Sequence, residues 1–527
     1  MSPRRPPTQW LPSIISMKSM PRFFLAMGFG ALSALALPPV GWVILLVPGF
    51  SGLVLLVERS SWQGAFMMGW FFGLGHFITG FYWISYAFLV DAPTYGWLAP
   101  IAVFILAAGL ALFPALALGC ASEFANQLCL RPWARVLALA GFWTFTEWLR
   151  GAVLTGFPWN LIGSVWVSSD SMMQSVAWIG VFALGSLTVF AAGAPAVLIR
   201  GITSRHICAA LSGIILLSGF WVAGGTRLKS GAVENVPNVR LRLVQPNIPQ
   251  HLKWQPNLRM RHIQKQLKMS QQISSKGQPP THVIWAETAV PFNLSKDRSL
   301  QKLIGAAAPA GGVLITGAPR ASPSQDGAQI LWNSAYAITS SGIVIATYDK
   351  QHLVPFGEYM PLRDILTLSK LTSGRTDFTP GTGPKNLVLP GLPPVALFIC
   401  YEVIFPDKVA MSTETSEHKP AWFLNITNDA WFGISWGPYQ HLAAARMRAV
   451  EHGLPVIRVA NTGISAAIDP FGRVVDSLSL GQIGVLDVEL ARPLPRTLFG
   501  RFGDMITWII LLLTLVFAAC AGRYRGS

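Results

Sequence analysis

Three ionisable residues, Glu287, Lys350 and Cys400, each end a short apolar run in the second half of the chain. Glu287 follows Val-Ile-Trp-Ala, Lys350 follows a run rich in Ile and Val, and Cys400 follows Ala-Leu-Phe-Ile. A thiol is mostly protonated at neutral pH, so it becomes a strong nucleophile only beside a base. A carboxylate with a raised pKa can take that proton, and a fixed ammonium can stabilise the charge on an attacked carbonyl oxygen. The three residue types together predict an acyl-transfer site.

Each of these residues also has a simpler interpretation when it is taken singly. A lone Glu or Lys at a strand end is usually a solvated turn residue, and a lone cysteine is as often a packed core thiol as a nucleophile. Cys400 is the only cysteine between Cys208 and Cys520, so this segment holds no internal disulfide. The five cysteines form no CxxC pair and the nine histidines show no metal-ligand spacing, so the sequence predicts neither a metal nor a cofactor.

The elements that must position these residues begin near residue 238, where short runs of Val, Ile and aromatic residues alternate with helical periodicity. The pattern predicts strands at 239–245, 282–287, 313–317, 332–339, 343–349, 395–400, 422–425, 456–460 and 465–469. It predicts helices at 257–275, 298–309 and 439–453, and loops at 321–330 and 366–386. Strands mixed with helices in this way indicate a layered α/β domain whose sheets are covered by helices.

The composition separates this domain from the rest of the chain. The 527 residues are 52% hydrophobic and only 12% charged, whereas soluble domains are roughly 25% charged. The apolar excess lies at 1–226 and 505–522, and 227–504 has the charge density of a soluble domain. These proportions predict a membrane protein with one large water-facing domain. The net charge of +16 is accompanied by no nucleic-acid motif, so we expect no nucleic-acid partner.

Eight apolar segments approach the roughly 20 residues that a helix needs to cross a membrane. They lie near 22–38, 41–57, 64–90, 97–124, 134–153, 172–199, 206–223 and 505–522. The second is the weakest of them, because it is short and contains Pro48 and Gly49. We therefore expect an α-helical bundle of about eight transmembrane helices.

Lysine and arginine mark one side of this predicted bundle. The connections near 38–41, 91–96 and 154–170 contain neither residue, whereas the N-terminal tail and the alternate connections do. Because cytoplasmic loops are enriched in Lys and Arg, we expect the N-terminus to lie in the cytoplasm. The chain then divides into a cytoplasmic tail at 1–21, a seven-helix bundle at 22–226, an extracytoplasmic domain at 227–504, and a last transmembrane helix with a cytoplasmic tail at 505–527.

The sequence around the three ionisable residues resembles the catalytic blocks of the nitrilase superfamily. These blocks are Ala-Glu-Thr-Ala-Val-Pro-Phe at 286–292, Tyr-Asp-Lys-Gln-His-Leu-Val-Pro-Phe-Gly-Glu-Tyr at 348–359 and Cys-Tyr-Glu-Val-Ile-Phe-Pro at 400–406. Asn-Ile-Thr-Asn-Asp-Ala-Trp-Phe-Gly at 425–433 and the segment 440–451 extend the match. With seven predicted spans before these blocks and one after, the chain from about residue 22 is similar to the apolipoprotein N-acyltransferase family.

The resemblance implies a four-layer αββα nitrilase-like sandwich, held in the periplasm over a base in the bacterial inner membrane. Members of the family move an acyl chain from a phospholipid, usually phosphatidylethanolamine, to the α-amino group of the diacylglyceryl-cysteine that begins an apolipoprotein. By resemblance, Glu287 is the general base, Lys350 the oxyanion stabiliser and Cys400 the thiolate that carries the acyl group as a thioester. This ping-pong transfer is the last step of lipoprotein maturation.

Four further residues match family positions around these three. Glu358 matches the family's second glutamate, which positions the catalytic groups. Tyr401 and Glu402 match the residues beside the nucleophile. We expect the backbone N–H of Tyr401 to help bind an oxyanion. Trp254 matches a tryptophan on the substrate side. Nothing in the sequence requires more than a monomer.

A lipid substrate also agrees with physical expectation, and it separates this interpretation from two alternatives. A reactive thioester must be shielded from water, and chains that stay partly in the bilayer avoid an extraction cost of ~0.8 kcal/mol per CH₂. A membrane-anchored nitrilase-type amidase that uses water as acceptor would have the same triad, although seven spans exceed what an anchor needs. A transporter with a degenerate cap would require mid-membrane charges and a repeat, and the sequence shows few such charges and no repeat.

Other ionisable residues have interpretations of their own. Glu147 and Arg150, near the outer end of the fifth predicted span, either contact a phospholipid headgroup or form an ion pair within the membrane. His76, on an apolar helix, is expected to be packed and hydrogen-bonded. Arg446 and Glu451 are expected to form a structural pair in the polar domain.

Overall fold

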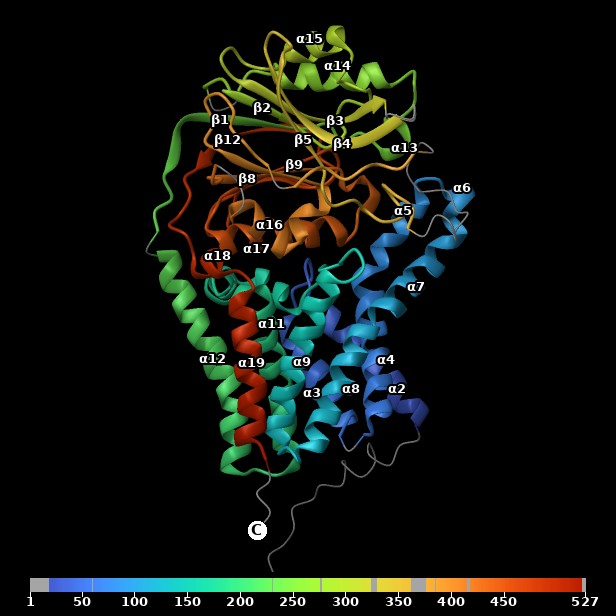
Figure 1. Cartoon of the computed structure of the whole chain (residues 1–527), viewed down its shortest axis with the longest axis vertical. Helices are drawn as coiled ribbons and strands as arrows, with labels where there is room; N and C mark the ends of the chain where they lie inside the picture. The colour runs from blue at the N-terminus through green and yellow to red at the C-terminus, as the bar shows by residue number, and fades with distance from the viewer. Residues whose placement is uncertain are drawn as a thin grey trace, which may run out of the picture.

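The computed structural model describes residues 19–523, apart from 59, 230, 275–276, 324–328, 362–375, 384 and 415–417. The described residues form a bundle of helices and a sandwich of two β-sheets, and the sandwich lies above the bundle in Figure 1. Most of the predicted N-terminal tail, the end of the C-terminal tail and most of the loop predicted at 366–386 lie outside the described residues.

Each of the eight segments predicted to cross the membrane is largely helical. The helices are α2 (Ser19–Ala34), α3 (Leu46–Leu56), α4 (Trp62–Phe81), α5 (Ser85–Leu89), α7 (Ala99–Leu110), α8 (Leu112–Gln127), α9 (Pro132–Ala152), α11 (Val176–Gly193), α12 (Ser204–Lys229) and α19 (Met505–Ala521). The short helices α6 (Ala92–Tyr95) and α10 (Asp170–Met173) and short 3₁₀ segments lie in the connections between them.

Three helical stretches among the described residues are both long and apolar enough to cross a membrane: Ala92–Gln127, Val176–Ile199 and Ser204–Lys229. Two further apolar helices, Val43–Leu56 and Met505–Ala521, are shorter. The helix α9 has 21 residues but carries Arg135, Glu147 and Arg150, which lower its apolar character. The number of eight crossings therefore stays a prediction.

Several helices of the bundle expose apolar side chains along their length. On α12 these are Ile207, Leu211, Ile214, Ile215, Leu216, Trp221 and Val222, and on α19 they are Ile509, Leu512, Leu513, Val516 and Phe517. Soluble monomers rarely expose apolar patches of this extent to water, whereas hydrocarbon chains solvate them well. The bundle is therefore built to face lipid, and the chain is a membrane protein.

The sandwich consists of two sheets of six strands each. The first sheet has the order β12 (Gly484–Ala491), β1 (Asn235–Gln245), β2 (His282–Trp285), β3 (Val313–Pro323), β4 (Gln329–Thr339) and β5 (Val344–Asp349). The second has the order β11 (Val474–Leu478), β10 (Ser465–Ile468), β9 (Val456–Ala460), β8 (Trp422–Thr427), β7 (Val395–Ile399) and β6 (Asn386–Leu387). Strands β1, β2 and β3 run parallel, as do β7, β8 and β9, so their carboxyl ends meet at one edge of each sheet.

Helices cover both outer faces of the sandwich (Figure 1). The first sheet is covered by α14 (Arg259–Ser270) and α15 (Arg298–Gly305), whose apolar residues share a buried cluster with it. The second sheet is covered by α16 (Pro406–Glu414) and α17 (Gly437–His452), which lie between it and the bundle. This order of layers is the predicted αββα arrangement.

The apolar core between the sheets continues into the bundle. All five residues of β7 are buried. The strand has a neighbouring strand on each side, and both faces of its sheet are covered. The buried cluster that contains β7 extends through Cys400 and Phe405 to Phe77, Trp83 and Trp159 on the membrane side. The predicted nucleophile therefore lies in a core that the two parts of the molecule share.

The predicted strands are present, and the differences lie at their ends and in weakly patterned segments. Strands β3 and β4 extend into the loop predicted at 321–330, because hairpin pairing from Pro323 to Gln329 imposes extended backbone on a Ser- and Pro-rich segment. Strands β6, β11 and β12 and helix α16 were not predicted. In β12 the apolar residues alternate with Asp487 and Glu489, and this period of two was an available signal.

The side-chain amide of Gln440 links the helix α17 to the bundle. The indole N–H groups of Trp83 and Trp159 each donate to Gln440 Oε1 at 3.0 Å. Gln440 Nε2 in turn lies 3.3 Å from the carbonyl oxygen of Gly80. All of these side chains are buried, so the interaction is shielded from water and fixes how α17 sits on the membrane helices.

Arg446 and Glu451 do not pair with each other, so that prediction was wrong. Arg446 Nη2 lies 2.6 Å from Asp170 Oδ1, and Arg448 Nε lies 3.0 Å from Glu451 Oε2. Helical residues three or four apart are neighbours, whereas residues five apart point in different directions. Glu451 also accepts the backbone N–H of Val181 at 3.1 Å, so both residues fasten α17 to the bundle.

We expect the substitution Gln440→Leu to lower the thermal unfolding temperature of the protein in detergent by several degrees. It leaves the buried indole N–H of Trp159 without its acceptor, which costs about 1–3 kcal/mol, while Trp83 keeps the Gly80 carbonyl at 3.1 Å. The matched control is Gln264→Leu on the exposed face of α14. Equal unfolding temperatures for the two variants would contradict the bridging role of Gln440.

Candidate active site

Cys400 lies at the turn between β7 and the short helix η6 (Cys400–Ile404). Its φ of 58° is in the left-handed region, which costs a residue other than glycine about 1–3 kcal/mol. The side chain is 8% exposed. Thr288, next to Glu287, and Phe356, two residues before Glu358, also have positive φ values of 45° and 62°. Strained backbone is therefore found in the three segments that carry predicted site residues.

Two side chains hold the backbone of this turn. Asn425 Nδ2 donates to the carbonyl oxygen of Cys400 at 3.0 Å, and His441 Nε2 lies 3.2 Å from the same oxygen. A carbonyl oxygen only accepts, so the His441 nitrogen is the donor. Asp429 Oδ1 lies 3.0 Å from His441 Nδ1, and Arg458 Nη2 donates to Asp429 Oδ2 at 2.6 Å. These side chains are fully buried, so the network fixes the strained conformation of Cys400.

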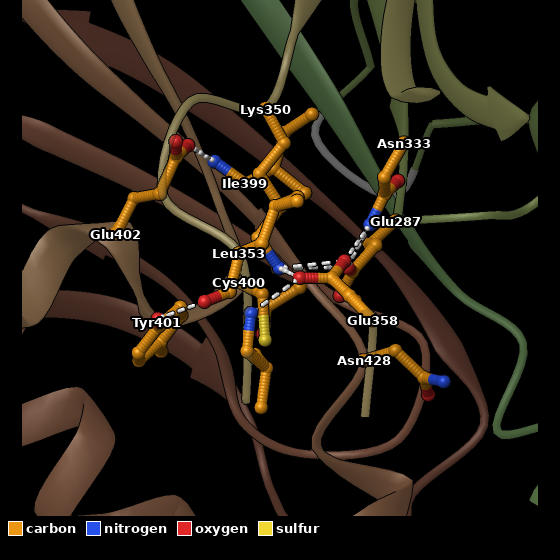
Figure 2. Close-up of polar contacts among 12 residues, drawn as sticks. Glu287, Asn333, Lys350, Leu353, Glu358, Ile399, Cys400, Tyr401, Glu402 and Asn428 are labelled. Atoms are coloured by element: carbon orange, nitrogen blue, oxygen red, sulfur yellow. Dashed lines mark hydrogen bonds and ion pairs between the residues drawn. The ribbon is translucent and has the colours of Figure 1, made fainter. Parts of the chain in front are cut away.

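The charged groups of the site meet around Lys350, beside Cys400 (Figure 2). Lys350 Nζ lies 2.9 Å from Glu358 Oε2 and 3.7 Å from Glu287 Oε1. Asn333 Nδ2 donates to Glu287 Oε1 at 2.7 Å and to Glu358 Oε1 at 2.8 Å. One ammonium and one amide thus hold together two carboxylates that would otherwise repel each other.

The environment sets the protonation of the three predicted catalytic groups. Burial raises the pKa of the Cys400 thiol and the Glu287 carboxylate raises it further, while Lys350 opposes the shift. Burial also raises the pKa of Glu287, and Lys350 is the main opposing charge. Burial alone would lower the pKa of Lys350, but Glu358 and the other anionic groups reverse this and raise it. The lysine is therefore a fixed cation, and the thiol keeps its proton until a base removes it.

Glu402 ties the nucleophile turn to the segment that follows β5. Its carboxylate accepts four hydrogen bonds, from the backbone N–H of Ile399 at 2.6 Å, Gln351 at 2.7 Å and His352 at 3.0 Å, and from the O–H of Tyr348 at 3.1 Å. Because Lys350 directly precedes two of these N–H groups, Glu402 fixes the position of Lys350 relative to Cys400. Burial raises the pKa of Glu402 to about 7, although Lys350 and the three N–H groups favour its charged form.

The structure places the two predicted aromatic residues differently. The hydroxyl of Tyr401 donates to the carbonyl of Leu353 at 2.6 Å, and Lys350 Nζ lies 5.4 Å from the centre of its ring. The N–H of Tyr401 is in the first turn of η6, where backbone N–H groups have no acceptor within the helix. Trp254 is half-buried, and among the described residues it takes no part in the hydrogen bonds around Lys350. Its contact with substrate stays a prediction.

Four polar residues around the site were not predicted from the sequence: Lys253, Asn333, Asn425 and His441. Asn425 and His441 lie within the segments that resemble the family, but no separate role was predicted for them. An amide inside the largely apolar strand β4 was the available signal for Asn333, because a buried polar group requires a partner. Lys253 ends the short helix α13 (Gln250–Lys253) and is nearly fully buried, which no local pattern indicates.

The remaining predicted residues lie in the bundle. Glu147 and Arg150 form a buried pair 3.6 Å apart, so the ion-pair interpretation is confirmed. Arg150 Nη1 also donates to the carbonyls of Phe157 and Trp159, at 2.7 and 2.8 Å. His76 is buried with its Nδ1 2.8 Å from the hydroxyl of Ser33, which confirms a packed and hydrogen-bonded histidine.

Two family models match the chain. The model described as the apolipoprotein N-acyltransferase N-terminal domain matches residues 29–194, and the model described as carbon-nitrogen hydrolase matches residues 240–497. The second match includes the strands and turns that carry Glu287, Lys350 and Cys400. The sandwich is therefore a carbon-nitrogen hydrolase domain, the nitrilase type of fold.

Relatives named apolipoprotein N-acyltransferase align with nearly the whole chain. The one from Rhodopseudomonas palustris is 42% identical over 96% of this chain and 96% of its own length. The one from Bradyrhizobium diazoefficiens is 41% identical over 94% of each, and the one from Brucella melitensis is 37% identical over 96% of each. The chain belongs to the apolipoprotein N-acyltransferase family.

Solved structures similar to part of this chain include an amidase and a second member of the nitrilase superfamily. An amidase from Nesterenkonia sp. has a TM-score of 0.36 and 19% identity, covering 53% of this chain and 99% of the amidase. Nit3 from Saccharomyces cerevisiae has a TM-score of 0.36 and 17% identity, covering 48% of this chain and 90% of its own.

We expect the isosteric substitution Glu402→Gln to lower both the unfolding temperature and the rate at which iodoacetamide alkylates Cys400. Each carboxylate oxygen of Glu402 accepts two hydrogen bonds. In the glutamine variant the NH₂ group therefore faces two hydrogen-bond donors in either orientation, which lowers the stability of the fold by about 1–3 kcal/mol. Glu414→Gln, at an exposed position, is the matched control. Wild-type stability and alkylation in the Glu402 variant would show that this carboxylate does not hold the turn.

Proposed function

We propose that this chain N-acylates bacterial apolipoproteins. It transfers an acyl chain from a phospholipid, in the first place phosphatidylethanolamine, to the α-amino group of the N-terminal diacylglyceryl-cysteine. The observation that carries the proposal is the position of the Cys400 site, which lies in an apolar core shared with the membrane helices. Such a position suits two substrates whose chains stay in the bilayer.

In the first half of the reaction, Glu287 takes the proton of the Cys400 thiol, and the thiolate attacks the ester carbonyl carbon of the phospholipid. Lys350 and the backbone N–H of Tyr401 stabilise the negative charge that develops on the carbonyl oxygen. The ester C–O bond then breaks, and Glu287 gives the proton to the departing oxygen. Lysophospholipid leaves, and the acyl group stays on the sulfur as a thioester.

In the second half, the unprotonated amine of the lipoprotein attacks the thioester carbonyl. The new C–N bond forms as the C–S bond breaks, and Glu287 passes the amine proton to the sulfur, which restores the thiol. Glu358 acts by holding Lys350, since its carboxylate is the nearer of the two at 2.9 Å. The burial of Cys400 supports transfer to an amine rather than hydrolysis, because it limits access of water to the thioester.

We further propose that the protein lies in the inner membrane as a monomer, with the sandwich in the periplasm. The first turns of α9 and α12 and the last turn of α19 lie at the end of the bundle away from the sandwich (Figure 1). By the bounds of these helices, Arg131, Arg135, Arg205 and Arg523 belong to these ends, which supports a cytoplasmic position for them because basic residues favour that side. The boundaries that fit this arrangement are 1–21 for the cytoplasmic tail, 22–226 for the bundle, 227–504 for the catalytic domain and 505–527 for the last span and its tail.

We expect Cys400→Ala to abolish transfer and Cys400→Ser to reduce it by roughly 10³-fold or more, because removal of a covalent nucleophile leaves little catalysis. Neither change should lower the unfolding temperature greatly. The rate of N-acylation of a fluorescent diacyl lipopeptide measures the effect, and Cys520→Ala, at an exposed thiol, is the control. Substantial transfer by the Cys400→Ala variant would disprove the nucleophile assignment.

The acceptor is tested by mixing the protein with acyl-labelled phosphatidylethanolamine and a diacyl lipopeptide. We expect the label to appear on the peptide amine, because the buried thioester favours a bound amine over water. Mass spectrometry of the peptide measures the product, and a lipopeptide with an acetylated N-terminus is the control. Release of free fatty acid without any N-acylated peptide would identify a hydrolase that uses water.

A further inference from the structure

Lys253 is a buried lysine that the proposed reaction does not use. Its side chain is 2% exposed, although it lies at the end of a helix of only four residues, α13. Its Nζ donates to the backbone carbonyl of Glu287 at 3.1 Å. Among the described residues this is its one hydrogen bond, so the ammonium has further N–H groups beside the end of β2.

The charge of this lysine acts on the reacting groups. Burial lowers the pKa of Lys253 to about 8, and the nearby Glu287 carboxylate and Cys400 oppose that shift. Lys253 in turn favours the ionised form of Glu287. A buried ammonium is unfavourable unless nearby negative charge compensates for it. The carboxylates of the site provide that charge.

Without Lys253, the site would have too few cations for its carboxylates. The charged groups that act on Glu287 and Cys400 are Lys350 after β5, Glu358 in the following loop and Asp429 in η7 (Asp429–Phe432). Glu402 in η6 acts on Lys350. Asp429 has its own cation, since Arg458 Nη2 lies 2.6 Å from its carboxylate. Without Lys253, the one ammonium of Lys350 would serve Glu287, Glu358 and Glu402 together.

We propose that Lys253 is a positioning residue for the general base: it holds the end of β2 through the Glu287 carbonyl and, as a second cation, keeps the Glu287 carboxylate ionised. The inference rests on the roles proposed for Glu287 and Cys400. Lys350 faces the oxyanion and is neutralised largely by Glu358, so the two lysines have separate tasks. Lys253 keeps the base ionised, and Lys350 stabilises the negative charge that forms on the carbonyl oxygen in the reaction.

The consequence is a shift in pH dependence. Removing a positive charge near Glu287 raises the pKa of its carboxyl, so the base becomes protonated at a higher pH than in the wild type. Activation of Cys400 requires the ionised base and therefore fails over the same range. In the variant Lys253→Met, the acid limb of Cys400 reactivity should move up by about one pH unit. On the acid side of that limb, the alkylation rate of the variant should be about tenfold lower than that of the wild type at the same pH.

The experiment measures alkylation of Cys400 by iodoacetamide between pH 5 and 9, followed by mass spectrometry of the peptide that contains residue 400. The matched control is Lys265→Met. Lys265 also donates to a backbone carbonyl, that of Pro246 at 2.7 Å, and burial alone lowers its pKa. Because alkylation needs neither phospholipid nor lipoprotein, an error in the proposed donor or acceptor leaves this comparison intact.

A shift in Lys253→Met and an unchanged limb in Lys265→Met would support the inference. An unchanged limb in a folded Lys253→Met variant would overturn it, as would equal shifts in the two variants, which would indicate a general effect of lost lysines. If Lys253→Met does not fold, Lys253→Gln replaces it, because it also removes the charge but keeps a polar group. The expected and contradicting results are then the same.

Discussion

One buried ammonium held between two carboxylates is the interaction on which the site depends. Lys350 lies 2.9 Å from Glu358 and 3.7 Å from Glu287, and all three groups are removed from water. Loss of the ammonium would leave the two buried carboxylates without the cation between them, at a cost of about 3–5 kcal/mol. The same burial raises the pKa of the Cys400 thiol, so the sulfur stays protonated until a base, in our proposal Glu287, takes its proton. Stability and reactivity of the site therefore depend on the same charges.

Cys400, the proposed nucleophile, and the membrane bundle are connected through adjacent residues of one helix. Gln440 accepts two indole N–H groups from the bundle, and the next residue, His441, donates to the carbonyl of Cys400. The backbone of Cys400 is in the left-handed region. Such fixed contacts are needed to hold it there, because this conformation is unfavourable by itself. The position of α17 on the membrane helices and the conformation of the nucleophile are therefore not independent.

Much of this arrangement could be predicted from the sequence, because it depends on local signals. Glu287, Lys350 and Cys400 end apolar strands, and such ends gather at the edges of the sheets. Lys253 and Asn333 could not be found in this way, because they meet Glu287 from 34 and 46 residues away along the chain. The pairing of Arg446 with Glu451 was wrong because five residues do not match the helical repeat. Hydropathy located the apolar helices, but it could not establish how many of them cross the membrane.

The most direct test of the account is the intact mass of the protein after it is mixed with phospholipid alone. An acyl-enzyme on Cys400 predicts a mass increase equal to one acyl group, on the peptide that contains residue 400, and its removal by hydroxylamine. The Cys400→Ala variant should show no increase. An unmodified Cys400 in a protein that still transfers acyl chains would contradict the account.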